Sequence, residues 1–201
     1  MMPLASPATS LDGDLYTWIT GVAQHTPAVL DSAVQVWSDF GLGLFALLML
    51  AAWWRSRAGD PVRIATALCA PPAVVAAYAV NDLLKTAVHE QRPCQTLHTV
   101  TVEACPPLGD WSFPSNHAAI AAAAAVAILL TDRRLAALAV PAALLMAASR
   151  VWIGVHYPHD VLIGLAVGAA VSWPLTVGAR RCAPVVVRLR DSRLRPLVAA
   201  R

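Results

Sequence analysis

The polar residues that could carry out chemistry are concentrated in three short segments of an otherwise apolar chain. These segments are Lys85–Pro93, Phe113–His117 and Ser149–Asp160. Each lies next to a long apolar run, where an ionisable side chain is costly and is by default a functional candidate. We therefore expect the three segments to meet in one pocket, where membrane helices join their connecting loops.

The cations in these segments suit a phosphate group. Lys85, Arg92 and Arg150 supply fixed positive charge, and the two arginines can hold phosphate oxygens bidentately. Ser115 and Asn116 begin a predicted helix, whose free N–H groups and positive dipole end bind anions. Because a transferring phosphoryl group spreads negative charge over its oxygens, these residues predict a site for phosphoryl transfer.

Two histidines and one aspartate could perform the transfer itself. His156 and His117 suit the nucleophile that attacks in line and the general acid that protonates the leaving oxygen. Asp160 follows His156 by four residues. If Pro158 begins a helix, the Asp160 carboxylate can turn back to the imidazole and fix its tautomer. Each such feature alone is usually structural, but their occurrence together and in order indicates chemistry.

The composition predicts that these segments are held by membrane helices. Hydrophobic residues make up 58% of the 201 residues and charged residues only 13%, which is unlike a soluble domain. A membrane helix needs roughly 20 residues, so the shorter runs must extend into their flanks. We expect an all-α polytopic membrane helix bundle of five transmembrane helices, or six if the N-terminal segment inserts. The five runs free of Asp, Glu, Lys and Arg are Phe40–Trp54, Ile64–Asn81, Trp111–Thr131, Leu135–Ser149 and Val161–Ala179.

The positions of the basic residues predict the orientation. Basic residues favour the cytoplasmic side of a membrane protein. The N-terminus and the connections that carry the three polar segments then lie outside, and Lys85, Arg92 and Arg150 are the basic residues left there. The residues assigned to the cytoplasmic side are Arg55, Arg57, Arg63, Arg133, Arg134, Arg180, Arg181, Arg188, Arg190, Arg193, Arg195 and Arg201.

The chain ends and the cysteines complete these expectations for a single domain over residues 1–201. Residues 1–35 form an N-terminal interfacial segment, with an amphipathic helix within Leu11–Ala33. The basic cytoplasmic tail, 181–201, either lies on anionic headgroups or is disordered and solvated. Cys94 and Cys105 fall in the long outer loop, where a disulfide is permitted; two free thiols are the alternative. No His/Cys spacing suggests a zinc site.

The three segments resemble the signature of the type 2 phosphatidic acid phosphatase superfamily, K-x6-R-P, P-S-G-H and S-R-x5-H-x3-D. The match runs through Lys85–Pro93, Pro114–His117 and Ser149–Asp160, with both internal spacings intact. Asn116 stands where the family usually has Gly. Asn tolerates the left-handed backbone region better than most residues, so the turn can survive.

The resemblance implies a phosphatase that works through a phosphohistidine, with no metal and no cofactor. His156 would be the nucleophile, Asp160 its orienting partner and His117 the acid for the leaving group. The phosphate-binding residues would be Lys85, Arg92, Ser115, Asn116 and Arg150.

The favoured substrate is a polyprenyl pyrophosphate such as undecaprenyl pyrophosphate, hydrolysed at the extracytoplasmic face of a bacterial cell membrane. Phosphatidic acid, phosphatidylglycerol phosphate and a polyprenyl-phosphoryl sugar phosphate remain open. The expected partners are the lipid phosphate substrate and the bilayer, without nucleic acid, and the oligomeric state is unknown. A lipid-phosphate binding or transport protein is the alternative from another class, although binding alone does not need the histidines. A phosphotransferase shares the same first step and is not separated by the sequence.

Overall fold

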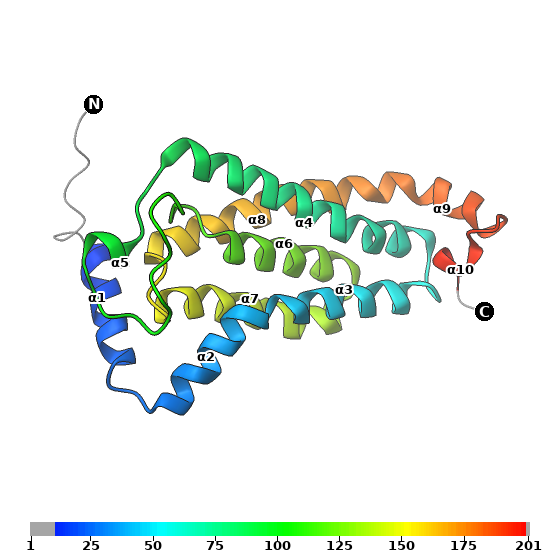
Figure 1. Cartoon of the computed structure of the whole chain (residues 1–201). Helices are drawn as coiled ribbons and strands as arrows, with labels where there is room; N and C mark the ends of the chain where they lie inside the picture. The colour runs from blue at the N-terminus through cyan, green and yellow to red at the C-terminus, as the bar shows by residue number, and fades with distance from the viewer. Residues whose placement is uncertain (1–10, 200–201) are drawn as a thin grey trace.

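Helices make up the regular structure of residues 11–199, the part of the chain that the computed structural model describes (Figure 1). No strand occurs in that range, so the all-α prediction is confirmed. In chain order the elements are α1 (Leu11–Ala23), α2 (Ala28–Phe40), α3 (Leu42–Ser56), α4 (Pro61–Val88), α5 (Pro93–Thr96), α6 (Asn116–Thr131), α7 (Arg133–Trp152), α8 (Pro158–Gly178), the 3-10 helix η2 (Ala179–Cys182), α9 (Ala183–Arg190) and α10 (Arg195–Val198).

The alanine-rich helix α6 forms the centre of the bundle, between α4 and α7 in Figure 1. It packs against α3, α4, α7 and α8, and its small side chains let these helices approach closely. The approach is closest to α8, where a Cβ added at Gly168 would lie 2.2 Å from the Ala119 carbonyl oxygen. Helix α6 is therefore held on all sides, and so is the polar segment at its N-terminus.

Three helical stretches are long and apolar enough to cross a membrane: 61–96, 133–152 and 158–190. Helices α2 and α3, of 13 and 15 residues, would make a fourth span only together, and this span would be bent by 51° where they meet. Helix α6 is apolar but has only 16 residues. The chain is thus a multi-pass membrane protein. Three or four spans among the described residues meet these criteria of length and composition, whereas α6, in the third of the five expected runs, is too short to meet them.

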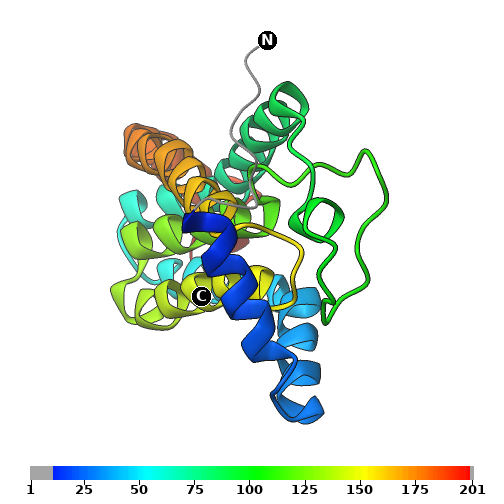
Figure 2. The same ribbon diagram turned by 90° about the vertical axis from the view of Figure 1, so that its left-hand side faces the viewer.

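The N-terminal segment is two helices rather than the single amphipathic helix expected within Leu11–Ala33. Pro27 precedes α2 and has no N–H with which to continue α1, so the chain turns there. Figure 2 shows α1 lying across one end of the bundle, where it packs against α7 and α8. Tyr16 of α1 is fully buried in this contact. The first ten residues of the 1–35 segment lie outside the described residues.

At the opposite end of the bundle, hydrogen bonds and ion pairs join the segments that carry most of the arginines. Asp132, before α7, accepts a hydrogen bond of 2.7 Å from Arg55 and lies 3.5 Å from Arg63.

The C-terminal tail is folded through Ala199, because Val186 and Val198 are buried against α4. The disordered-tail alternative is therefore wrong for the described part of the tail. Ala200 and Arg201 lie outside that part.

Candidate active site

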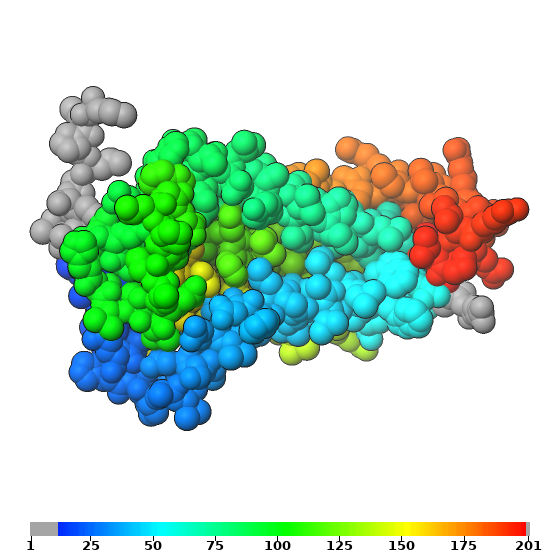
Figure 3. Space-filling view, viewed as in Figure 1, coloured from blue at the N-terminus to red at the C-terminus, as the bar shows by residue number. Residues whose placement is uncertain are grey.

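The three polar segments meet at the end of the bundle that α1 covers. Helix α4 ends in this region at Val88, and its C-cap, His89, has a φ of 55°, in the left-handed region. Ser115 is the N-cap of α6, and Pro158 is the first residue of α8, as the sequence predicted. In Figure 3 the connection between α4 and α6, coloured green, spreads over this end of the molecule.

His156 belongs to the connection between α7 and α8 and is 2% exposed. Its imidazole lies between Asp160 and Arg92. Its Nδ1 lies 3.2 Å from Asp160 Oδ2, and its Nε2 lies 3.3 Å from an Arg92 nitrogen. The same Asp160 oxygen accepts hydrogen bonds from the Ser112 hydroxyl and, at 2.8 Å, from the Tyr157 N–H. Because a carboxylate accepts at Nδ1, that nitrogen carries the proton and Nε2 keeps the lone pair.

The surroundings of His156 keep its imidazole neutral. Burial lowers the pKa of His156 to about 4, and the charges of Arg92 and Arg150 act in the same direction. The hydrogen bond and the charge of Asp160 oppose them but do not prevail. At neutral pH the imidazole is therefore an uncharged base with an available lone pair.

Arg92 is fixed by backbone and side-chain acceptors around its guanidinium. It donates to the Asp110 carbonyl and carboxylate, both at 2.9 Å, and to the Val155 carbonyl at 2.8 Å. Its side chain is buried, so the planar cation is presented in one orientation beside His156.

Lys85 and Arg150 approach the same region from α4 and α7, and both are buried. The Lys85 ammonium donates to the Trp111 carbonyl at 2.7 Å. Arg150 donates to the Ser38 hydroxyl at 2.6 Å and lies 3.7 Å from Glu103. Its Nε is buried and has no hydrogen-bond partner within residues 11–199. That free donor is available to an anion.

The segment at the start of α6 adds neutral donors. The Ser115 hydroxyl is buried without a partner among the described residues, and its N–H donates to the Asp160 carbonyl at 3.1 Å. His117 lies close enough to Arg150, His156, Arg92 and Lys85 to interact with them electrostatically. Asn116 faces elsewhere: its amide oxygen accepts from Asn81 at 2.7 Å. The Asn116 side chain thus braces α6 against α4, and a role of Asn116 in phosphate binding, through its N–H at the start of α6, stays a prediction.

Several residues of the site were not predicted from the sequence. Ser112 and Asp110 belong to the loop before α6 and carry no spacing signal that would distinguish them from other loop residues. Glu90 and His159 lie in variable positions of the first and third segments, and in the structure His159 contacts both Glu90 and Asp160. Asp12 reaches His159 from α1, which no local pattern could indicate.

A disulfide closes the loop that begins two residues after Arg92. Cys94 and Cys105 are bonded, with their Cα atoms 5.9 Å apart. Closing a loop of this length removes conformational freedom from the unfolded chain. The bond therefore restrains residues 94–105, which follow Arg92 and Pro93 directly.

Comparison with known proteins decides the family. A model of the PAP2 superfamily matches residues 66–183, which contain all three polar segments. The chain belongs to the PAP2 superfamily. It is 32% identical over 162 residues to undecaprenyl-diphosphatase BcrC of Bacillus subtilis, covering 80% of each chain.

Two further comparisons agree with the PAP2 superfamily assignment. Decaprenylphosphoryl-5-phosphoribose phosphatase of Mycobacterium tuberculosis is 42% identical over 97 residues, about half of either protein. The crystal structure of a PAP2-type phosphatidylglycerolphosphate phosphatase from Bacillus subtilis superimposes with a TM-score of 0.60 at 18% identity, covering 87% of this chain and 89% of that one. The fold is shared, and this PAP2 superfamily chain is a membrane lipid phosphatase.

Proposed function

We propose that the protein hydrolyses a polyprenyl diphosphate, with undecaprenyl diphosphate as the favoured substrate, through a phosphohistidine on His156. The observation that carries the proposal is the arrangement around the imidazole. Asp160 holds Nδ1, while Nε2 faces the cations that would bind the phosphate. A buried nucleophile beside fixed cations suits the stabilisation of a phosphoryl group in transfer.

The two steps follow from these positions. His156 Nε2 attacks the terminal phosphorus while the bond to the bridging oxygen breaks. His117, kept protonated among the cations by the negative charge of the bound diphosphate, gives its proton to that leaving oxygen. Water then attacks the phosphohistidine, His117 takes a proton from the water, and inorganic phosphate leaves. Arg92, Arg150 and the Ser115 hydroxyl hold the phosphoryl oxygens throughout.

The relatives support a polyprenyl substrate. Undecaprenyl-diphosphatase BcrC is matched over most of both chains, and the mycobacterial relative is named for a decaprenylphosphoryl substrate. The phosphatidylglycerolphosphate phosphatase shares the fold at an identity too low to indicate a substrate. We therefore place polyprenyl diphosphate first and a polyprenyl-phosphoryl sugar phosphate second.

The experiment is phosphate release by the detergent-purified protein from a panel of lipids, with EDTA present and His156→Ala alongside. The panel contains undecaprenyl diphosphate, phosphatidic acid and phosphatidylglycerol phosphate. We expect undecaprenyl diphosphate to be hydrolysed fastest and the variant to lose at least about 10³-fold in rate, as when a nucleophile is removed.

Other outcomes of the same panel would change the proposal. Faster release from another lipid would replace the substrate and keep the chemistry. Release that does not depend on His156 would overturn the phosphohistidine, and no release from any lipid would favour binding or transport. Transfer to an added acceptor lipid, without free phosphate, would favour a phosphotransferase.

A further inference from the structure

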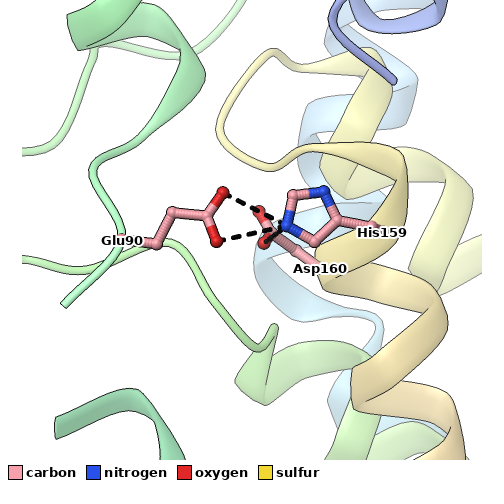
Figure 4. A group of neighbouring side chains, drawn as sticks. All are labelled: Glu90, His159 and Asp160. Atoms are coloured by element: carbon pink, nitrogen blue, oxygen red, sulfur yellow. Dashed lines mark hydrogen bonds and ion pairs between the residues drawn. The ribbon is translucent and has the colours of Figure 1, made fainter. Parts of the chain in front are cut away.

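His159 lies among carboxylates from three parts of the chain. Its Nδ1 is 2.7 Å from an Asp12 oxygen of α1, and its backbone N–H donates to the other Asp12 oxygen at 3.1 Å. Its Nε2 lies 3.1 and 3.2 Å from the two Glu90 oxygens and 3.3 Å from Asp160 Oδ1. Figure 4 shows Glu90 and Asp160 converging on this nitrogen.

The ring is also fixed in orientation. It stacks on Tyr157, with centroids 5.5 Å apart and an interplanar angle of 19°, and it lies 5.6 Å from the Phe113 ring. These ring contacts favour the orientation in which both nitrogens meet the carboxylates. The contacts of both nitrogens are therefore set by the fold.

The partners of His159 determine its hydrogen bonding. Both ring nitrogens face carboxylate oxygens, which only accept, so both must donate. The imidazole with two N–H groups meets this requirement and carries a positive charge that the carboxylates balance. Glu90, His159 and Asp160 are also residue types that ligate divalent metals, and their ligand atoms lie within 4.8 Å of one another. A test must therefore separate the imidazolium from a bound metal.

The contact with Asp160 links this cluster to His156. Asp160 Oδ2 is occupied by Ser112, the Tyr157 N–H and His156. Asp160 Oδ1 is buried and has no hydrogen bond in the described part of the chain, so the His159 nitrogen 3.3 Å away is its nearest cation. If that cation were removed, the bonds on Oδ2 would still hold the carboxylate, but Oδ1 would lose its nearest positive charge, so the charge that the carboxylate presents to His156 would change.

We propose that His159, as an imidazolium held by Asp12 of α1 and by Glu90, is a positioning residue that orients Asp160 and, through it, His156. The inference rests on the proposed phosphohistidine mechanism, because it assigns His159 no contact with the substrate. It also gives α1 a part in the reaction: the helix supplies Asp12, which holds the far side of the ring.

The test is steady-state kinetics of the full-length protein on farnesyl diphosphate, a soluble prenyl diphosphate, with His159→Gln, His159→Leu and Asp12→Asn. We expect His159→Leu to lower kcat by about 10- to 100-fold, because a small displacement of a catalytic group can cost about 100-fold in rate. Gln keeps one N–H donor and should lose less than Leu. The KM should change less than about threefold, because the phosphate-binding cations are untouched.

The matched control is Tyr16→Phe, which removes hydrogen bonds of α1 to Gly154 and Thr99 but no contact with His159. We expect it to lower the melting temperature and to leave kcat unchanged. If His159→Leu lowered only the melting temperature, as Tyr16→Phe does, His159 would merely dock α1 and the proposal would fall. Asp12→Asn weakens the hold on the ring from α1 while α8 stays unaltered, so it tests the proposal even if the His159 variants do not fold.

Two further arms separate this inference from other failures. EDTA should leave the wild-type kcat unchanged; a loss that zinc restores would show that the cluster holds a metal, and would overturn the imidazolium. An inactive wild type would contradict the proposed function. An active wild type with unchanged kcat in all three variants would contradict only the role of His159.

Discussion

His156 must be an uncharged base, and it must also lie beside the cations that bind phosphate. A phosphate site needs cations, and cations beside an imidazole, together with burial, keep it from taking up a proton. The structure places Arg92 3.3 Å from Nε2 while Asp160 holds Nδ1, so the cations and the neutral nucleophile coexist. The carboxylate then supports the positive charge that forms on the ring when Nε2 binds phosphorus.

This arrangement predicts the acid limb of the pH profile. Below its pKa, His156 is protonated and has no lone pair, so kcat/KM should fall as the pH drops through about 4, the value to which burial lowers that pKa. The measurement is kcat/KM on a soluble prenyl diphosphate between about pH 3.5 and 7.5. Return to pH 7 controls for unfolding. A reversible limb near 6.5, the ordinary pKa of histidine, would show that His156 titrates as in water.

Single residues also show where sequence reasoning succeeds. His156 and Asp160 were predictable because a spacing of four residues and an intervening Pro158 bring them together within one turn. Asp12 and Ser112 were not, because each reaches Asp160 or its neighbour His159 across a gap in sequence that only the folded chain closes.

Among the elements, α6 and α8 form the contact on which the site depends. A Cβ at Gly164 would lie 2.5 Å from the Ser115 carbonyl oxygen, and one at Gly168 would lie 2.2 Å from that of Ala119. Distances this short leave no room for a methyl group, so a larger residue must separate the two helices. Because α6 carries Ser115 and α8 carries Asp160, such a separation would also disturb the site.

Gly168→Ala should therefore destabilise the protein by about 1–3 kcal/mol, the usual cost of overpacking, and lower its activity. Gly178→Ala is the matched control on the same helix, since nothing lies within 4 Å of its added Cβ. We expect that variant to be neutral or slightly stabilised. Thermal unfolding in detergent and phosphate release are the two measurements. Equal behaviour of the two variants would mean that the α6–α8 contact can relax without cost.

Helix boundaries were predicted less well than helices. Counting apolar residues started the third run at Trp111, but α6 begins at Asn116, because Pro114 and the N-cap Ser115 determine its start. In the N-terminal segment, Pro27 separates two helices where the sequence pattern predicted one. Hydropathy measures burial or contact with lipid, whereas caps and prolines decide where a helix begins and ends.

At the scale of the whole molecule, the two ends have opposite character. One end gathers the predicted chemistry under α1 and a loop closed by the Cys94–Cys105 disulfide. The other joins the basic segments through Asp132, and Arg190 donates to the Gly59 carbonyl at 2.8 Å. The arginine count predicted this separation without any structure, because each loop inherits its side from the spans that flank it.

The orientation of the two ends is a prediction that cysteine labelling can test. In a Cys69→Ser background, the exposed thiol of Cys182 marks the basic end. With Cys182→Ser added, Leu108→Cys marks the site end, where Leu108 is 79% exposed. In right-side-out spheroplasts, a membrane-impermeant maleimide should label Leu108→Cys at once and Cys182 only after the membrane is opened. A diphosphate headgroup that cannot cross the bilayer would then meet its site only from outside. The reverse pattern would place the site in the cytoplasm and contradict an extracytoplasmic phosphatase.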